Sequence, residues 1–275
     1  MRKNIKIKID TLYNLSQLKD SEIDLANAAL SIGSLDYPKV DLDSYYTHLR
    51  SIKKALENKQ TGSLGKSIEK INYVLFNIYN YRGDTENYND PQNANIIRVI
   101  DRRLGLPVTL GVLYIHAAQS LGLSGHGLAF PGHFLVRLEL NGQRAIIDPF
   151  NDGQVMRVEQ LRSLLKKIMG NNVELKPSYC ASLSNKDILI RILNNLKIRA
   201  LNNQDIERGL TILRRMTILK PTSPDLWKEL GKLESNRGNL KNAVNAFTIF
   251  VEKCCSEEER LSAIRIVNQL KKKLN

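Results

Sequence analysis

The segment from residue 105 to residue 150 constrains the fold of this 275-residue chain more than any other part. Its first half, Val108 to Leu121, is apolar on nearly every helical face, which is typical of a central, buried helix. Pro107 fits the first turn, where its missing N–H is not needed, and Gly122 ends the helix. The sequence therefore predicts a helix that other elements cover on all sides.

The second half of the segment predicts a β-hairpin. Asn141-Gly142 is the strongest short signal for a two-residue type I′ turn. The register that this turn sets pairs Glu139 with Arg144, and opposite charges at paired positions support it. In the same register His133 and Asp148 are diagonal neighbours on one face, about 7–8 Å apart at the backbone and within side-chain reach. One residue inserted in the turn would put them on opposite faces.

A helix followed by a histidine and then by an aspartate on a hairpin is the order of parts in a papain-type site. In such a site the helix N-terminus carries a cysteine, because the helix dipole and the free N–H groups favour the thiolate. His133, expected to open a strand opposite Phe150, would deprotonate the nucleophile, and Asp148 would orient the histidine. The segment contains no cysteine, since the cysteines of the chain are Cys180, Cys254 and Cys255.

Thr109 lies in the first helical turn, where the missing nucleophile would be. A threonine hydroxyl is far less acidic than a thiol, and its known activation uses a free N-terminal amine that Thr109 cannot supply. The plainer interpretation is that Thr109 satisfies a backbone N–H at the helix start and that His133 is a half-buried strand histidine bonded to Asp148. His126, His133 and Asp148 have the ligand types of a metal site, but no spacing motif supports one. We expect neither a metal nor a cofactor.

The N-terminal region, residues 1–104, is predicted to be helical. Ser21 and Asp24 resemble a capping box ahead of an apolar helix. Apolar spacing predicts further helices near residues 42–57, 66–80 and 92–104, with an irregular polar segment at 82–93 between the last two. Gly105 stands in the position of a C-terminal cap for the last of these helices.

From about residue 185 the chain predicts paired helices to its end. The tetratricopeptide pattern of W-x2-L-G followed by Gly, Ala and an aromatic residue fits six positions: Trp227, Leu230, Gly231, Gly238, Ala243 and Phe247. A shift of 34 residues towards the N-terminus gives a weaker match that Pro221 closes: Leu193, Leu196, Ala200, Gly209 and Leu213. The segment from Leu261 to Leu274 would cover the last apolar face.

These patterns together predict a mostly helical α+β fold. We expect an N-terminal helical region (1–104), a papain-like core with a small antiparallel sheet packed with those helices (105–180), and a tetratricopeptide repeat domain (185–275).

The net charge of +13 is unevenly distributed. Residues 1–160 carry 19 Lys and Arg against 17 Asp and Glu, whereas residues 161–275 carry 22 against 11. Such a surplus suits an acidic partner or nucleic acid, but no nucleic-acid module is recognisable, and a solvated helical surface explains it as well. The N-terminus has no apolar signal-peptide region, and no run of about 18 apolar residues predicts a membrane helix. We expect a cytoplasmic protein with reduced cysteines and no membrane association.

Several of these segments resemble the SirB family of bacterial proteins, named for an invasion-gene regulator. The resemblance covers roughly residues 20–260 and rests on Leu25–Pro38 (LANAALSIGSLDYP), Arg82–Pro91, Arg102–Leu110 (RRLGLPVTL), Phe130–Arg137 (FPGHFLVR) and Asp148–Phe150 (DPF). It implies a transglutaminase-like core, whose His and Asp match His133 and Asp148, followed by tetratricopeptide repeats. The cysteine of that core would fall between Pro107 and Thr109, and SirB-type proteins commonly lack it.

The sequence leaves three functions open. The first, which we favour, is a non-catalytic protein that binds a protein partner or acts as a regulatory scaffold through its core and its repeats, because repeat arrays offer a concave peptide-binding surface. The second is a hydrolase or acyl transferase that uses Thr109 or an activated water, with His133 as base and Asp148 as orienter. The third is association with an acidic partner or nucleic acid through the basic C-terminal part.

Overall fold

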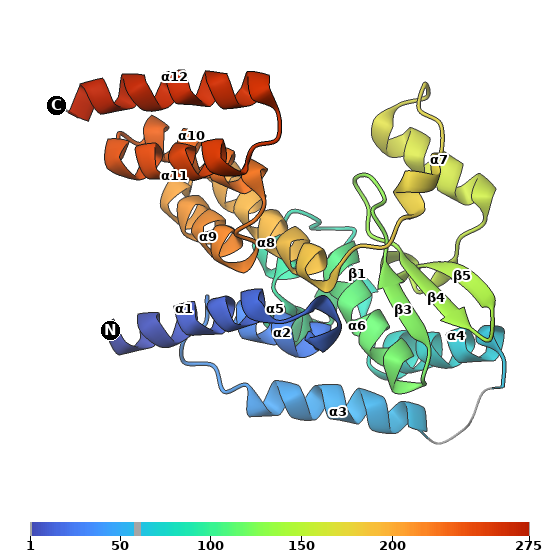
Figure 1. Cartoon of the computed structure of the whole chain (residues 1–275). Helices are drawn as coiled ribbons and strands as arrows, with labels where there is room; N and C mark the ends of the chain where they lie inside the picture. Colours follow the sequence, from blue (N-terminus) through green and yellow to red (C-terminus); the bar gives the residue numbers. More distant parts are fainter. Residues whose placement is uncertain (1, 58–61, 275) are drawn as a thin grey trace. The chain divides into compact units, whose positions relative to one another are not determined.

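The computed structural model describes residues 2–57 and 62–274, with side chains described from residue 10 onwards (Figure 1). The described chain is mostly helical with a small antiparallel sheet, as the sequence predicts. It divides into two compact units. One unit spans Lys19–Ile192, and the other joins the described residues up to Leu18 to those from Leu193 onwards. No helix among the described residues is long and apolar enough to cross a membrane.

Helix α6 (Pro107–Ser120) forms the centre of the Lys19–Ile192 unit. Every residue from Pro107 to Ile115 is buried, which confirms the predicted central helix. Four helices pack around it: α2 (Leu25–Gly33), α3 (Asp43–Glu57), α4 (Leu64–Asn72) and α5 (Ile96–Arg102). Strands β3 and β4 also contact α6, so that helices and sheet together exclude water from it.

The sheet has four antiparallel strands in the order β3 (Ser124–Gly127), β4 (Val136–Leu140), β5 (Gln143–Asp148) and β6 (Gln154–Val155). The register between β4 and β5 is the predicted one, with Glu139 opposite Arg144. Asn141 and Gly142 have φ values of 49° and 80°, as the left-handed positions of a type I′ turn require. Helix α7 (Val158–Met169) contributes Leu161 and Leu165 to an apolar cluster with Phe130 and other buried residues of the preceding segment.

The prediction that His133 opens a strand opposite Phe150 is wrong. Strand β4 begins only at Val136, and His133 lies in the turn that precedes it. The guanidinium of Arg191 donates hydrogen bonds to the backbone oxygens of Phe130 and His133, so the oxygen of His133 bonds a side chain instead of another strand. On the other side of the hairpin the chain leaves the sheet after Asp148, because residues 149–151 form a 3-10 turn that the Asp148 side chain caps.

The predicted N-terminal helices are present with two differences in extent. Helix α4 is followed by a π-helical turn over Tyr73–Ile78. The helix expected at 92–104 is shorter, because a 3-10 turn over Pro91–Ala94 precedes α5.

The C-terminal cap of α5 is Arg103, with φ 64°, and not Gly105 as predicted. The Arg103 guanidinium holds this backbone in place through the Tyr81 hydroxyl, at 2.7 Å, and His48 Nε2, at 3.0 Å. Gly105 instead pairs with Gly83 in a short parallel sheet of β1 (Arg82–Gly83) and β2 (Leu104–Gly105).

The other unit consists of helices, and α1 (Arg2–Gln17) packs against α9 (Ile206–Leu219). After α9 follow α10 (Pro224–Asn236), α11 (Leu240–Lys253) and α12 (Glu257–Leu274), each packed on the one before. Helix α8 (Asn185–Asn202) runs through the boundary at residue 192. Gly231 of α10 lies so close to the Phe247 ring of α11 that a Cβ atom at this position would be 2.8 Å from it, which explains why the repeat pattern has glycine here.

Candidate functional site

The structure brings His133 and Asp148 together as a buried pair. His133 Nε2 lies 2.9 Å from Asp148 Oδ1, and the side chains are 11% and 1% exposed. Asp148 also accepts the backbone N–H of Phe150, at 3.0 Å, and the side-chain amide of Asn151, at 2.6 Å. A carboxylate held by several donors fixes the ring that it bonds. Because the carboxylate accepts, Nε2 carries the hydrogen, and Nδ1 is the nitrogen that could act as a base.

The Thr109 hydroxyl is occupied by backbone groups at the start of α6. Its oxygen accepts the N–H of Leu106 at 3.0 Å, and its single hydrogen is shared between the carbonyl oxygens of Asn93, at 2.9 Å, and Leu106, at 3.1 Å. The residue is fully buried. This is the arrangement of the plainer interpretation, in which Thr109 satisfies a backbone N–H at the helix start. None of the hydrogen bonds that the described residues make with Thr109 involves His133.

A polar network that the sequence did not indicate holds the segment before α6. The Asn93 side chain donates to Asp84 Oδ2 at 2.9 Å and accepts from Arg102 at 3.0 Å. Burial by itself would raise the pKa of Asp84, but hydrogen bonds from the Asn87 N–H and the Asn93 amide, with the charge of Arg102, hold it below its usual value. Arg102 also pairs with Asp90 at 3.1 Å. No local pattern in the sequence links Arg102 to residues 84–93.

Aromatic rings join this network to the His133–Asp148 pair. The Phe150 ring lies edge-to-face with His133, at 6.1 Å between centroids, and with Tyr88, at 5.8 Å. Gly83 lies directly against Phe150, since a Cβ atom at this position would be 2.5 Å from the Phe150 carbonyl oxygen. The segment around residues 82–93 therefore packs beside the pair and also, through Asn93, against the N-terminal turn of α6.

The arrangement provides an oriented base without a sulfur nucleophile at the helix start. Pro107, Val108 and Thr109 occupy the first turn, and none has a thiol. His126 lies in β3 opposite Arg137. Within residues 2–57 and 62–274 no group of three or more His, Cys, Asp or Glu side chains could hold a metal ion, so His126 does not complete a ligand set with the pair.

Comparisons with known proteins agree with this architecture. A family model described as "Transglutaminase-like superfamily" matches residues 43–194, and one described as "Tetratricopeptide repeat" matches residues 196–269. A UPF0162 protein of Xylella fastidiosa (strain 9a5c) is 31% identical over 247 residues, which is 88% of each chain. A UPF0162 protein of Vibrio cholerae is 26% identical over 249 residues, covering 88% of this chain and 91% of its own.

Among solved structures, a crystal structure of menin that reveals the binding site for Mixed Lineage Leukemia protein covers 94% of this chain and 74% of its own. Its TM-score is 0.42 at 10% identity. The transglutaminase-like match includes α6, the hairpin and the His133–Asp148 pair, and the repeat match runs from the C-terminal part of α8 into α12. The chain therefore belongs to the transglutaminase-like superfamily, in the group of UPF0162 proteins, with a tetratricopeptide region after its transglutaminase-like part.

Proposed function

We propose that this protein is a non-catalytic member of the transglutaminase-like superfamily that acts as a protein-binding or regulatory scaffold through its core and its repeats. The observation that carries the proposal is the start of α6, whose first turn contains no thiol and whose Thr109 hydroxyl is bonded to the backbone. The resemblance to the SirB family, which implies a regulatory role, is consistent with this function.

Energetics also favour a structural role for Thr109. To attack a substrate, its hydroxyl would have to leave the Leu106 N–H and two carbonyl oxygens inside a fully buried site. Leaving a buried donor unsatisfied costs about 1–3 kcal/mol, and this cost would be added to the barrier of the reaction. A water molecule activated by His133 Nδ1 would avoid that cost and is the alternative that an activity measurement must address.

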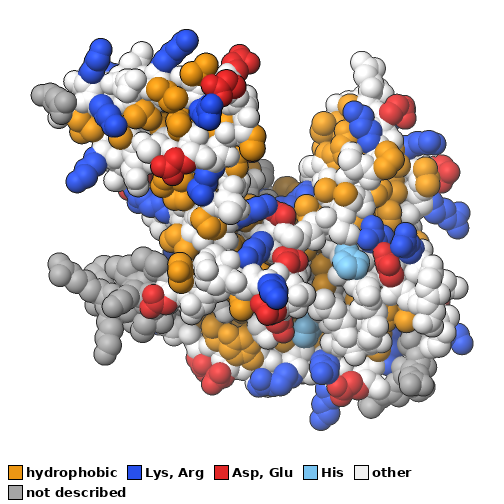
Figure 2. Space-filling model, viewed as in Figure 1, with side chains coloured by type: hydrophobic (Ala, Val, Ile, Leu, Met, Phe, Trp, Pro, Cys, Tyr) orange, Lys and Arg blue, Asp and Glu red, His pale blue; other side chains and the backbone are white. Residues whose placement is uncertain are grey.

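The repeat region supports the binding part of the proposal. Stacked helix pairs offer extended surfaces for peptides, and residues 161–275 carry 22 basic against 11 acidic side chains. On the face shown in Figure 2, Lys and Arg side chains over the C-terminal helices are interspersed with hydrophobic and acidic side chains. This mixture suits a protein partner with an acidic segment better than a nucleic-acid backbone, which favours a continuous basic stripe.

Catalysis is tested by incubating the full chain with a glutamine peptide and an amine, and separately with activated esters and peptides. We expect no turnover beyond that of a His133→Ala variant. The matched control is His126→Ala, which removes a half-buried histidine outside the pair. Turnover that His133→Ala abolishes and His126→Ala retains would show that the protein is an enzyme.

Binding is tested by capturing partners from cells that make the protein and then measuring affinity with each purified partner. Lys232→Glu and Lys241→Glu change exposed residues of α10 and α11, and Lys66→Glu is the control on α4. We expect the repeat variants to lower the affinity for a partner at least fivefold and the control to leave that affinity unchanged. If the original protein and all of these variants bind the partner with equal affinity, the repeats are not the binding element.

A further inference from the structure

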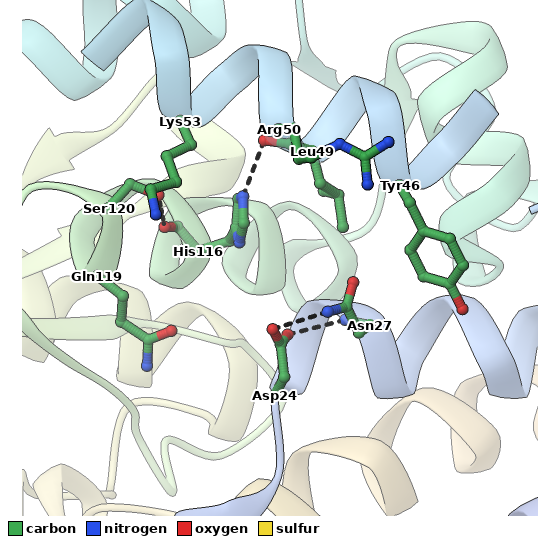
Figure 3. Close-up of a pocket in the computed structure, with 9 residues that line it drawn as sticks. All are labelled: Asp24, Asn27, Tyr46, Leu49, Arg50, Lys53, His116, Gln119 and Ser120. Atoms are coloured by element: carbon green, nitrogen blue, oxygen red, sulfur yellow. Dashed lines mark hydrogen bonds between the residues drawn. The ribbon is translucent and has the colours of Figure 1, made fainter. Parts of the chain in front are cut away.

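A pocket in the Lys19–Ile192 unit lies towards the opposite end of α6 from Thr109. It has a volume of about 530 Å³ and opens between α2, α3 and the C-terminal half of α6 (Figure 3). Its walls include Asp24 and Asn27 from α2 and its N-cap, Arg50 and Lys53 from α3, and His116 and Gln119 from α6. Small-molecule sites in proteins commonly measure about 300–1,000 Å³, so the space is sufficient for an organic molecule.

The α3 wall of this pocket carries two cations without a counter-ion. Arg50 and Lys53 are three residues apart, which places them on the same helical face. Arg50 donates to the neutral hydroxyl of Thr47 at 2.7 Å. Within the described part of the chain, no carboxylate lies within 4.0 Å of the charged nitrogens of either side chain. The positive charge on this wall is therefore available to a ligand.

The carboxylate on the opposite wall does not neutralise these cations. Asp24 caps α2, and its two oxygens accept the backbone N–H of Asn27 at 3.0 Å and the Asn27 amide at 2.8 Å. In Figure 3 Asp24 and Asn27 lie across the gap from the α3 side chains. The carboxylate already stabilises a helix N-terminus, where a negative charge is favourable, so the pocket keeps a net positive wall.

The α6 wall supplies two polar side chains, and a hydrogen bond holds one of them in place. His116 Nε2 lies 3.1 Å from the carbonyl oxygen of Leu49, and since a carbonyl only accepts, Nε2 carries the hydrogen. No described residue forms a hydrogen bond with His116 Nδ1. The hydrogen bond to Leu49 holds the ring, and Gln119 adds an amide with both a donor and an acceptor.

We propose that this pocket binds a small organic anion, whose phosphate or carboxylate groups contact Arg50 and Lys53 while its polar body contacts His116 and Gln119. A guanidinium matches the two oxygens of such a group with two parallel hydrogen bonds, and a lysine adds a point charge. The volume exceeds the need of a bare inorganic ion, so the ligand has a body as well as a charged group. This site is separate from the His133–Asp148 pair, which lies near the other end of α6.

The test measures binding to the full chain by calorimetry at a fixed salt concentration. The panel contains a nucleoside monophosphate, a sugar phosphate and a tricarboxylate. Their neutral counterparts are the uncharged nucleoside, the free sugar and the triamide of the tricarboxylate. We expect at least one anion to bind and its neutral counterpart not to bind. The phosphate and carboxylate arms distinguish the two kinds of charged group.

Variants locate the site. Arg50→Gln and Lys53→Gln should each lower the affinity for the anion by about tenfold, which is the loss expected for one charge-assisted contact. Lys54→Gln is the matched control, because Lys54 is an exposed lysine on the same helix outside the pocket. All three changes affect exposed residues, so the melting temperature without ligand should stay that of the original protein.

Two results would overturn the proposal. One is that no anion in the panel binds more tightly than its neutral counterpart. The other is that Lys54→Gln weakens binding as much as Lys53→Gln, since diffuse attraction by a basic surface would then account for the binding.

Discussion

Individual side chains in the Lys19–Ile192 unit derive their properties from their partners. His133 is bonded to a carboxylate through Nε2. His48 instead accepts from the Tyr81 hydroxyl at 2.7 Å and lies 3.0 Å from the Arg103 guanidinium. Burial, followed by the charges of Arg103 and His116, lowers the pKa of His48 to about 4. The same residue type is therefore an oriented base at one position and a neutral acceptor at the other.

The low pKa of His48 predicts a loss of stability in mild acid. An unfolded histidine has a pKa near 6.5, so below this pH the unfolded chain takes up a proton that the folded chain refuses until about pH 4. We expect the unfolding free energy to fall by about 2–3 kcal/mol from this residue as the pH drops from 6.5 to 4. Urea unfolding at several pH values measures the fall. His48→Gln should flatten the slope and His126→Gln should not; an unchanged slope in His48→Gln would contradict the assignment.

Asp148 should contribute more to stability than His133, although the two form one pair. Removing His133 leaves Asp148 with the Phe150 N–H and the Asn151 amide, whereas removing Asp148 leaves three donors without their acceptor. We expect Asp148→Ala to cost about 2–4 kcal/mol and His133→Ala about 1–2 kcal/mol. Chemical denaturation of both single variants and the double variant gives the coupling. A greater loss for His133→Ala would show that the other bonds to Asp148 contribute little.

At the scale of the elements, contacts with neighbouring elements restrict which residues a helix or strand can have. The turn at Asn141-Gly142 sets the β4–β5 register by itself. The turn before β4 is held by another element, because Arg191 donates hydrogen bonds to the backbone oxygens of Phe130 and His133. In the repeats, α10 and α11 pack closely where Gly231 meets the Phe247 ring. A small residue is needed there because of the neighbouring helix and not because of the backbone angle of Gly231.

Gly231→Ala should therefore destabilise the protein even though alanine favours helices. The new Cβ would lie 2.8 Å from the Phe247 ring, and overpacking of this kind costs about 1–3 kcal/mol. The matched control is Gly65→Ala in α4, where nothing lies within 4 Å of the new Cβ and a gain of about 0.5–1 kcal/mol is expected. Thermal unfolding of both variants tests the pair of predictions. A stabilising Gly231→Ala would mean that the two helices can separate without cost.

At the scale of the whole molecule, compact units do not follow chain order. The sequence predicts domain boundaries near residues 104 and 185, whereas the compact units of the structure have their boundaries after residues 18 and 192. The N-terminal helices surround α6, because a helix that is apolar on all sides needs partners on all sides. The first helix is an exception, since α1 packs against α9 of the repeat region.

A change in α1 should consequently affect the distant C-terminal helices. Leu12 is 2% exposed, and Leu12→Ala should cost about 2–5 kcal/mol. Hydrogen exchange should then speed up in the helices from α9 to α12 and stay unchanged in α6. The control, Tyr13→Ala, alters a side chain that is 57% exposed. It should change neither the stability nor the hydrogen exchange of these helices. Faster exchange in α6 than in α9 would assign α1 to the other unit.

The sequence by itself determined the features that local rules govern. An apolar run between Pro107 and Gly122 identified α6, and a repeat motif identified the C-terminal helices. The Asn141-Gly142 turn set the register of β4 against β5. The start of a helix is also a local feature. The sequence therefore showed that the first turn of α6 contains no thiol.

Only the tertiary structure decided what the polar groups of these elements bond to. The hydroxyl of Thr109 meets Asn93, and the network of Asp84, Asn93 and Arg102 forms across loops. The pocket with Arg50 and Lys53 arises where three helices meet. A hydrogen bond or a cavity between distant segments depends on distances that no local pattern encodes, because it is packing that brings those segments together.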